Sequence, residues 1–495
     1  MVRQLDYSRL ILILLFALGI RLAGVMSRPI WYDEAFSILM SEQGPPAILT
    51  GTISTDADAS AAEEHPPAYY FMLWGWIKAF SNSLSSVRSL SILASLGIVM
   101  LVYLIGANLF NPTTGLTASL FAAILPFQVH YAQEIRMYVF LALWLSIATY
   151  ALLKRRWILF AISAALAQYT HNLAAIYLIL LALTPIIRKD WKMLRALTLA
   201  GFAAIILYSP WLIHLPAQFS KIQNNFWIER PGVERLFTLF LYFIPNLPLP
   251  EIWLFVGLSF ATLIIALAAY QTYLAIRLKL PGYDHGLWLA YLSFVPAIVL
   301  WLVSQFVPLY IERALLPSHV FFCLWLAWAL TKTSLPRPVQ LSAFALIIAS
   351  AAIGIQQHVT YGGFPYGPYS QLDQSLNERL QPGDVIVHSN KLSYLPAVYF
   401  DRSLPQSFIR DPVGAKTDTL SPTSIQVLRL NAAEDVESAT AEASRVWFVI
   451  FQQSIDEFRN QGQITHPDVE YLEKQFILVT VEQWSDVRLY LFTRR

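Results

Sequence analysis

Charged side chains are scarce in this chain. Only 13% of its 495 residues are Asp, Glu, Lys or Arg, whereas 56% are hydrophobic. Soluble domains carry about a quarter charged residues. A chain of this length with so little charge cannot bury its apolar surface in one water-soluble core, so we expect a lipid bilayer as its solvent. The net charge of +2 gives no indication of nucleic-acid binding.

The chain has only one cysteine, and the common nucleotide-binding motif is absent from its sequence. The single cysteine, Cys323, lies within an apolar run, which excludes a disulfide framework. Gly362 and Gly363 are not followed by the spaced glycines of a phosphate-binding loop. The first apolar run, 10–26, has no small-residue cleavage site after it, so we interpret it as a retained first span and not as a signal peptide.

Apolar runs of roughly membrane-spanning length recur along the first 355 residues. A transmembrane helix needs about 20 such residues. We expect eleven spans, at 10–26, 86–109, 113–130, 135–153, 157–170, 173–187, 194–213, 251–276, 286–307, 313–331 and 337–355. Two shorter runs, 66–80 and 233–249, are interrupted by Pro, Trp, Tyr or Lys, and we expect them to form interfacial helices against the outer surface.

The positions of Lys and Arg set the orientation of these spans. With the N-terminus inside, every cytoplasmic segment except 110–112 is basic, as the positive-inside rule requires. The basic residues are Arg3, Arg9, Lys154, Arg155, Arg156, Arg188, Lys189, Lys192, Arg195, Arg277, Lys279, Lys332 and Arg337. If the two shorter runs were spans, these basic residues would be distributed over both sides of the membrane, so the interfacial interpretation is better supported. We therefore predict a multi-pass protein of the plasma (inner) membrane with outer connections at 27–85, 131–136 and 214–250.

After residue 356 the composition changes. Pro, Gly, Asp and Gln become frequent, and the apolar runs shorten to strand length, at 384–388, 446–451, 476–481 and 488–493. This pattern predicts a small soluble α/β domain over 356–495, and the odd number of spans places it outside the cytoplasm. The predicted fold is thus a polytopic α-helical membrane protein of about eleven transmembrane helices, residues 1–355, followed by a small C-terminal α/β domain.

Two adjacent carboxylates, Asp33 and Glu34, follow the first span within the segment Trp31–Ser37. They could simply begin a helix, because Asp33 is a good N-cap and negative charge is favoured in the first turn. The alternative is catalytic. A carboxylate held beside aromatic rings at a water-poor interface is suited to act as a general base.

The outer segment Glu63–Tyr70 places Glu64 and His65 directly before Pro66 and Pro67, which open a helix. A surface helix with an acidic start explains this pattern without any function. The alternative is that Glu64 and His65 bind a divalent cation or a phosphate at the helix start. A Glu-His pair by itself is a weak indication of a metal site.

Charged residues also stand at the outer ends of later spans. Glu134 and Arg136 lie in Tyr131–Tyr138, and Arg313 lies at the outer end of span ten. Each could cap a helix or extend its charge to the interface. We expect His171–Asn172 to form a turn without a role. Taken together, carboxylates, a histidine and two arginines at the outer face predict a site for an anionic, membrane-borne substrate.

These motifs follow one another in a familiar order. The Asp-Glu pair, the His-Pro-Pro helix, Ala-Gln-Glu-x-Arg-Met-Tyr, and the segment Tyr310–Pro317 resemble the GT-C glycosyltransferases of the protein O-mannosyltransferase and lipid A aminoarabinose-transferase type. The resemblance covers roughly residues 10–330. It implies transfer of a sugar from a polyprenyl-phosphate donor to a hydroxyl of a lipid, glycan or protein acceptor, with inversion in a single displacement.

The resemblance also implies residue roles. These are catalysis for Asp33 (as the base) and Glu134, donor-phosphate binding for His65, Arg136 and Arg313, substrate contact for Glu34, Tyr69 and Tyr138, and ligation of a divalent metal cation for Glu64 and His65. Two departures stand out. Family members often carry Asp or a basic residue where this chain has Glu134 and His65, and loop 214–250 offers only His214 as a further histidine.

Two other classes of protein fit parts of the sequence. A transporter or flippase of lipid-linked glycans would also have many spans, but transporters usually place ionisable residues near mid-membrane. Here the middles of the spans are almost free of charge, which favours the enzyme. The second alternative is a receptor-like protein whose function lies in the C-terminal domain, where we find no evident catalytic set.

Overall fold

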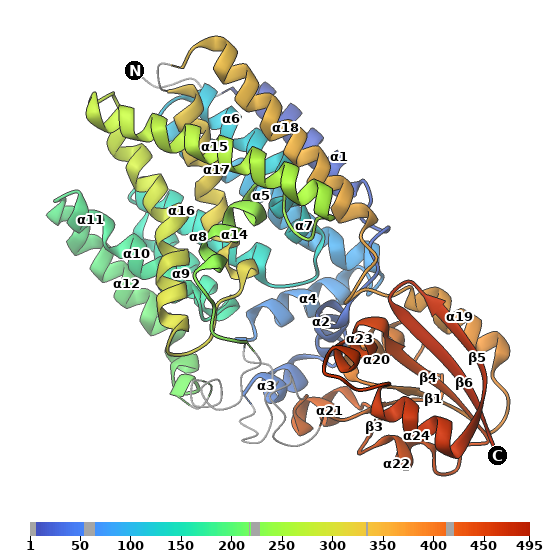
Figure 1. The fold of residues 1–495 in the computed structure, drawn as a ribbon. Helices are drawn as coiled ribbons and strands as arrows, with labels where there is room; N and C mark the ends of the chain where they lie inside the picture. Colours follow the sequence, from blue (N-terminus) through green and yellow to red (C-terminus); the bar gives the residue numbers. More distant parts are fainter. Residues whose placement is uncertain (1–5, 54–64, 217, 219–227, 333–334, 412–419) are drawn as a thin grey trace.

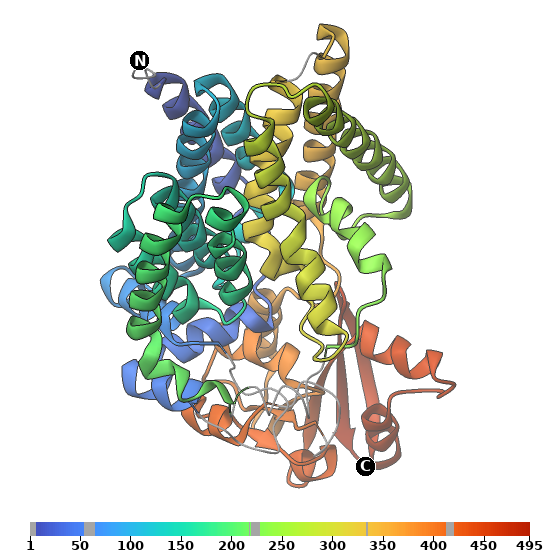
Figure 2. The ribbon, with the colours of Figure 1, turned by 90° about the vertical axis from the view of Figure 1, so that its left-hand side faces the viewer.

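The computed structural model describes residues 6–53, 65–216, 218, 228–332, 335–411 and 420–495. Figure 1 shows a helical body, which begins at the N-terminus, and a sheet domain at the opposite end of the molecule, which ends at the C-terminus. Seen from the side in Figure 2, the orange-to-red C-terminal part lies along one end of the helical body. The prediction of a mostly helical chain with a small C-terminal sheet domain is confirmed.

Six helices in the described ranges are long and apolar enough to cross a membrane. They are α5 (Leu84–Leu109), α12 (Trp191–Leu212), α15 (Glu251–Arg277), α16 (Tyr283–Ser304), α17 (Leu316–Thr331) with the preceding 3-10 turn η1 (Glu312–Leu315), and α18 (Arg337–Thr360). A seventh span results if α7 (Pro126–Gln133) and α8 (Tyr138–Leu153), bent by 116° at the break between them, count as one. The predicted count of eleven is not confirmed.

The other predicted spans form shorter helices. These are α1 (Tyr7–Leu22), α6 (Pro112–Ile124), α9 (Trp157–Thr170), α10 (Ala174–Ala182) and α11 (Thr184–Ile187). Proline interrupts two of the apolar runs: Pro126 begins α7, and Pro185 lies in the first turn of α11, where its missing N–H is tolerated. Hydropathy measures composition and not the continuity of a helix, so these breaks were not predicted.

The helical body is built around α17. Within its apolar window 94% of the residues are buried inside the protein, against 22% in α15, whose outer side chains are left for lipid. Helices α5 and α6 pack closely, because a Cβ added to Gly106 would lie only 2.9 Å from the Cα of Gly115. Small residues at such contacts are typical of helix pairs in membranes.

Both runs predicted to be interfacial form short helices, α4 (Ala68–Ala79) and α14 (Glu234–Phe243). Two further short helices, α2 (Tyr32–Glu42) and α3 (Pro45–Ile53), come between α1 and α4 in the chain. Figure 1 shows α2, α3 and α4 between the long helices and the sheet domain. Side chains of this layer therefore meet the sheet domain on one side and the long helices on the other.

Six strands of the described chain form one sheet, in the order β3-β2-β1-β4-β6-β5. They are β1 (Asp384–His388), β2 (Gln406–Ile409), β3 (Ala432–Ala433), β4 (Arg445–Phe451), β5 (Phe476–Trp484) and β6 (Val487–Arg494). The first four are parallel neighbours, and β6 is antiparallel to both β4 and β5. The sequence predicted β1, β4, β5 and β6, whereas β2 and β3 are too short to give an apolar run.

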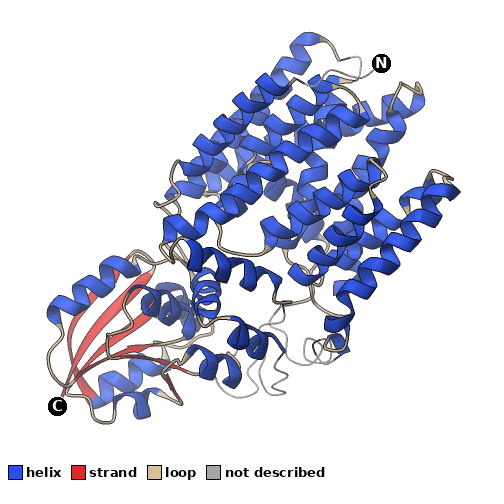
Figure 3. Ribbon diagram, turned by 180° about the vertical axis from the view of Figure 1, so that it is seen from behind, coloured by secondary structure: helices blue, strands red, loops and turns tan. Residues whose placement is uncertain are grey.

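Helices cover both faces of this sheet, and Figure 3 shows the strands as a single layer between them. The helices are α19 (Tyr369–Arg379), α20 (Lys391–Phe400), α21 (Pro422–Leu428), α22 (Val436–Thr440), α23 (Gln452–Asn460) and α24 (Pro467–Gln475). Because both faces are covered, the central strand β4 is buried without alternation from Val446 to Phe451.

Polar contacts join the sheet domain to the layer of short helices. Helix α20 packs against α2. The Tyr399 hydroxyl donates to the carbonyl oxygen of Asn82 over 2.9 Å, and the Arg402 guanidinium forms an ion pair with the Glu42 carboxylate at the end of α2. The same α2 begins with the paired carboxylates, so the domain is attached to the element that carries them.

Candidate active site

The two adjacent carboxylates of α2 have different surroundings. Both lie in the first turn of the helix, where the exposed N–H groups favour negative charge. The Glu34 side chain is 2% exposed, forms an ion pair with Arg88 over 3.2 Å and accepts the backbone N–H of Ile135 over 3.0 Å. These contacts bind α2 to α5 and to the turn between α7 and α8. Glu34 therefore holds these elements together at the site. Its predicted contact with substrate stays a prediction.

Asp33 lies between two guanidinium groups. Arg313 Nη1 is 2.6 Å from Asp33 Oδ2, and Arg136 Nε is 3.7 Å from the same oxygen. Arg136 also donates to Ser37 Oγ over 3.1 Å, which fixes its side chain against α2. Arg313 comes from η1 and Arg136 from the turn between α7 and α8. The structure thus brings together three of the predicted site residues from three distant segments.

Glu134 lies in the four-residue turn between α7 and α8, outside both helices. Its side chain is buried, and its Oε2 has no hydrogen-bond partner within the described chain. Burial raises the pKa of the Glu134 carboxyl to about 7, although the positive charge of Arg313 opposes the shift and the charge of Glu34 adds to it. A carboxyl that exchanges its proton near neutral pH is suited to acid–base chemistry.

Aromatic side chains enclose this group of charges. The Arg313 guanidinium lies 5.7 Å from the ring centre of Trp31 and 5.2 Å from that of Tyr138, within the range of cation–π attraction. Tyr69, on α4, is buried with its ring 5.7 Å from that of Tyr70. Tyr138 is therefore in contact with the charged centre, whereas Tyr69 lies in the aromatic packing beside it.

His65 meets a residue to which the sequence gave no role. Its ring centre lies 4.7 Å from that of His171, and the His171 ring lies 5.6 Å from that of Tyr138. His171 is 4% exposed, and its Nδ1 accepts the backbone N–H of Leu173 over 3.1 Å. A neutral imidazole whose Nδ1 accepts carries its proton on Nε2. His171 is therefore a buried donor beside the predicted site.

Several buried polar atoms around Arg313 have no hydrogen-bond partner in the described chain. They are Trp31 Nε1, Glu134 Oε2, Tyr138 Oη and His171 Nε2. Folded proteins satisfy nearly all buried polar groups, so a cluster of exceptions needs an explanation. A polar substrate that supplies the missing partners is one. No sequence signal identified His171, because a His-Asn pair between two spans reads as an ordinary turn.

A small pocket lies at one side of this centre. The pocket beside Glu134 measures about 10 Å³ and is lined by Arg28, Trp31, Glu34, Arg88, Gln133, Glu134 and Tyr366. That volume is about the minimum for one water molecule and far below that of a sugar.

The metal expectation rests on a residue outside the described ranges. Glu64 lies in the segment that is not described, and His65 is the first residue after it. Among the residues that are described, no group of three or more His, Cys, Asp or Glu side chains could hold a metal ion. Metal ligation by Glu64 and His65 therefore stays a prediction.

The chain has a GT-C-like fold, as comparisons with known proteins show. Residues 64–214 match the model of the dolichyl-phosphate-mannose-protein mannosyltransferase family. The match includes the segments with His65, Glu134, Arg136 and His171. A sequence comparison with curated proteins gives no significant match. The resemblance drawn from the sequence motifs is confirmed.

Similar solved structures include two GT-C glycosyltransferases. The apo structure of ArnT from Cupriavidus metallidurans is 12% identical, with a TM-score of 0.62 over 97% of this chain and 97% of that one. ArnT bound to undecaprenyl phosphate matches with a TM-score of 0.61 at 12% identity, over 98% of both chains. The apo oligosaccharyltransferase of Archaeoglobus fulgidus is also 12% identical, with a TM-score of 0.53 over 97% of this chain and 74% of its own. At these identities the likeness establishes the fold.

Proposed function

We propose that the protein is a glycosyltransferase that moves a sugar from a polyprenyl-phosphate donor to an acceptor hydroxyl at the outer face of the inner membrane. The observation that carries the proposal is the Asp33 carboxylate held between Arg136 and Arg313. One candidate base stands beside two permanent cations, which is the combination that a hydroxyl nucleophile and a phosphate leaving group require. The match to a mannosyltransferase family and the fold shared with ArnT support it.

The proposed reaction is a single displacement. The acceptor hydroxyl attacks the anomeric carbon while Asp33 takes the hydroxyl proton. The bond between the anomeric carbon and the phosphate oxygen breaks, and the electron pair leaves with the polyprenyl phosphate, so the configuration inverts. Arg313 and Arg136, with His65 nearby, stabilise the charge that develops on the phosphate. No glycosyl-enzyme intermediate forms.

The buried polar atoms without a partner in the described chain could form hydrogen bonds with the substrates in this reaction. Tyr138 Oη and His171 Nε2 can donate hydrogen bonds to the phosphate or to sugar oxygens, and Glu134 Oε2 can accept one from a sugar or acceptor hydroxyl. Bound donor and acceptor would supply the partners that these groups lack within the described chain. Their hydrogen bonds would therefore contribute to substrate binding and to its orientation.

The membrane arrangement is part of the proposal. Residues 1–355 would form the membrane domain, with up to eleven crossing segments if the shorter helices also enter the bilayer. Residues 356–495 would lie outside the cytoplasm. Because α20 packs on α2, the sheet domain would then lie on the outer side, next to the helix that carries Asp33. A C-terminal reporter that is active only in the cytoplasm would contradict the orientation.

A divalent cation could assist the leaving phosphate. The fold is shared with the Archaeoglobus fulgidus oligosaccharyltransferase in its complex with Zn and sulfate, which matches with a TM-score of 0.52 at 13% identity. We propose Glu64 and His65 as the residues of this chain that would hold such an ion, which would neutralise phosphate charge. Activity that survives exhaustive chelation would remove the metal from the scheme.

The experiment that tests the function uses the purified full chain in detergent. It is incubated with a panel of polyprenyl-phosphate sugars, and release of polyprenyl phosphate is measured with and without candidate acceptors. We expect one donor class to be consumed. Consumption of none, together with movement of intact lipid-linked glycan across vesicle membranes, would instead support the flippase alternative, for which neither the family match nor the fold gives support.

A further inference from the structure

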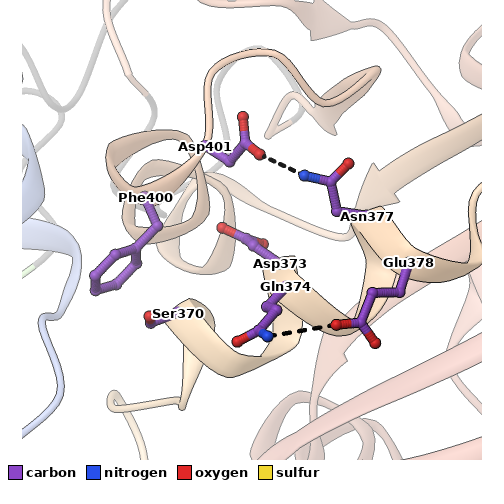
Figure 4. A pocket seen from close by; sticks show the side chains of 7 residues that line it. All are labelled: Ser370, Asp373, Gln374, Asn377, Glu378, Phe400 and Asp401. Atoms are coloured by element: carbon purple, nitrogen blue, oxygen red, sulfur yellow. Dashed lines mark hydrogen bonds between the residues drawn. The ribbon is translucent and has the colours of Figure 1, made fainter.

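A second pocket lies in the sheet domain, between α19 and the end of α20 (Figure 4). It has a volume of about 440 Å³, which is within the range of pockets that bind small molecules. Its lining consists of six residues with polar side chains, Ser370, Asp373, Gln374, Asn377, Glu378 and Asp401, together with Phe400. None of these residues belongs to the candidate active site.

Asp373 is the unusual member of this lining. Its side chain is 3% exposed, and its Oδ2 has no hydrogen-bond partner in the described chain. Figure 4 shows its carboxyl group in the middle of the pocket, between α19 and Asp401. Burial raises the pKa of the Asp373 carboxyl to about 8, with a further contribution from the charge of Asp401. At neutral pH this carboxyl is therefore protonated and can donate a hydrogen bond.

Four other lining side chains form two hydrogen-bonded pairs, each with an amide donor and a carboxylate acceptor. Asn377 Nδ2 donates to Asp401 Oδ2 over 3.1 Å, and Gln374 Nε2 donates to Glu378 Oε1 over 3.3 Å. Each of these four side chains has further donor or acceptor capacity. The Phe400 ring adds an apolar surface at one side of the pocket (Figure 4). Such a mixture suits a neutral ligand with many hydroxyl groups.

A metal ion fits this pocket less well. Within the part of the chain that is described, no group of three or more His, Cys, Asp or Glu side chains could hold one, although three carboxyl groups line the pocket. Asp401 is already engaged, because its Oδ1 accepts the backbone N–H and the hydroxyl of Ser403 over 2.9 and 2.6 Å.

The pocket is close to the element that carries the candidate base. Asp401 directly follows α20, which packs on α2, and the next residue, Arg402, forms the ion pair with Glu42 at the end of α2. Asp33 lies in the first turn of the same helix. The pocket therefore lies near the end of α2 that is remote from Asp33. The two ends are about 16 Å apart, because the helix has 11 residues.

We propose that this pocket binds a neutral sugar unit of the acceptor, distinct from the sugar that is transferred. The acceptor would then be a glycan or a glycan-bearing molecule, anchored in the sheet domain while its reactive hydroxyl reaches Asp33. The proposal rests on the glycosyltransferase function and names the chemical class of its acceptor. It also gives the sheet domain a task in the reaction.

The test is binding of neutral oligosaccharides to the full chain in detergent, measured by saturation-transfer NMR with mannose, glucose, galactose and N-acetylglucosamine oligomers. The variants are Asp373→Ala and Asn377→Ala, with Asp456→Ala as a control at an exposed carboxylate of the same domain. We expect at least one oligosaccharide to bind, both pocket variants to weaken it about tenfold, and the control to bind normally. Because Asp373 Oδ2 has no partner, Asp373→Ala should not lower the melting temperature.

The possible outcomes separate this proposal from the proposed function. Binding of no oligosaccharide, binding that both pocket variants leave unchanged, or binding of calcium in place of a sugar would overturn the pocket assignment. A donor assay that shows no turnover while pocket-dependent sugar binding persists would overturn the enzyme function alone. With a glycan acceptor in hand, the pocket variants should raise the acceptor KM about tenfold and leave slow hydrolysis of the donor unchanged.

Discussion

Arg313 Nη1 lies 2.6 Å from Asp33 Oδ2, although 280 positions separate the two residues in the chain. The guanidinium that we assign to the donor phosphate thus pairs with the candidate base.

The first prediction concerns Arg313. Replacing it with Gln removes a cation that stabilises the leaving phosphate, so kcat/KM for the donor should fall about 10²–10³-fold. The donor KM should rise, because the phosphate loses a contact. Arg235→Gln is the matched control, since Arg235 is an exposed residue that forms an ion pair with Glu312, the neighbour of Arg313. Equal losses in both variants would contradict a specific role of Arg313.

The second prediction separates the two carboxylates of α2. Glu34 and Arg88 form a buried pair, so Glu34→Gln leaves a buried guanidinium without its counter-charge. We expect a loss of about 3–5 kcal/mol in the free energy of unfolding, measured as a fall in apparent melting temperature. Asp33 and its partner Arg313 are more exposed than the Glu34–Arg88 pair, so Asp33→Asn should lose activity with a smaller fall in melting temperature than Glu34→Gln. A Glu34 variant of normal stability that binds donor weakly would make Glu34 a substrate ligand.

The third prediction is a pH profile. Because the pKa of Glu134 is raised to about 7, its carboxylate form grows about tenfold between pH 6 and pH 8. If the carboxylate accepts a substrate hydroxyl, kcat/KM should rise by a similar factor over this interval. Glu134→Gln should be slow and should lack this inflection. The same inflection in the Gln variant would assign the titration to another group.

The fourth prediction concerns His171. If Nε2 donates to the substrate, His171→Ala should raise the donor KM or lower kcat about tenfold or more, with a normal melting temperature. His171→Gln, which keeps a donor, should recover part of the loss. His285→Ala is the control, because its ring packs on Phe110 away from the charged centre. A melting temperature lowered as strongly as activity would indicate packing alone.

The fifth prediction uses the titration of Asp373. Its folded pKa of about 8 lies far above the ordinary value of a carboxyl, so the folded state holds a proton that the unfolded state loses. Stability of the sheet domain should therefore decline as pH rises from about 4 to about 8. Asp373→Asn removes this contribution. Relative to the wild type, the melting temperature of that variant should increase over the same interval, and a constant difference would contradict the assignment.

Much of this arrangement could be predicted from the sequence. Low charge and long apolar runs predicted a helical membrane protein, and the shortened runs after residue 356 predicted four of the six strands. Asp33, Arg136 and Arg313 were singled out because charged residues gather at the outer ends of the predicted spans and because the family resemblance gives these positions roles. The number of spans could not be derived in this way, because Pro126 and Pro185 break runs that hydropathy treats as continuous.

The ion-pair partners of the two adjacent carboxylates could not be predicted from the sequence either. Nothing in the pair Asp33-Glu34 indicates that one carboxylate pairs with Arg313 and its neighbour with Arg88, since both partners come from distant segments. Two further residues of the proposed sites could not be identified from the sequence either. His171 looks like a turn residue, and Asp373 looks like an ordinary helical carboxylate until its burial is known.

The central claim is that Asp33 is the base of a sugar transfer from a polyprenyl-phosphate donor. The most direct measurement compares wild type and Asp33→Asn with one accepted donor and acceptor, following glycosylated product and donor binding together. We expect product formation to fall about 10²–10⁴-fold while the variant still binds the donor. Near-normal turnover by Asp33→Asn would contradict the account and move the base to another carboxylate of the site.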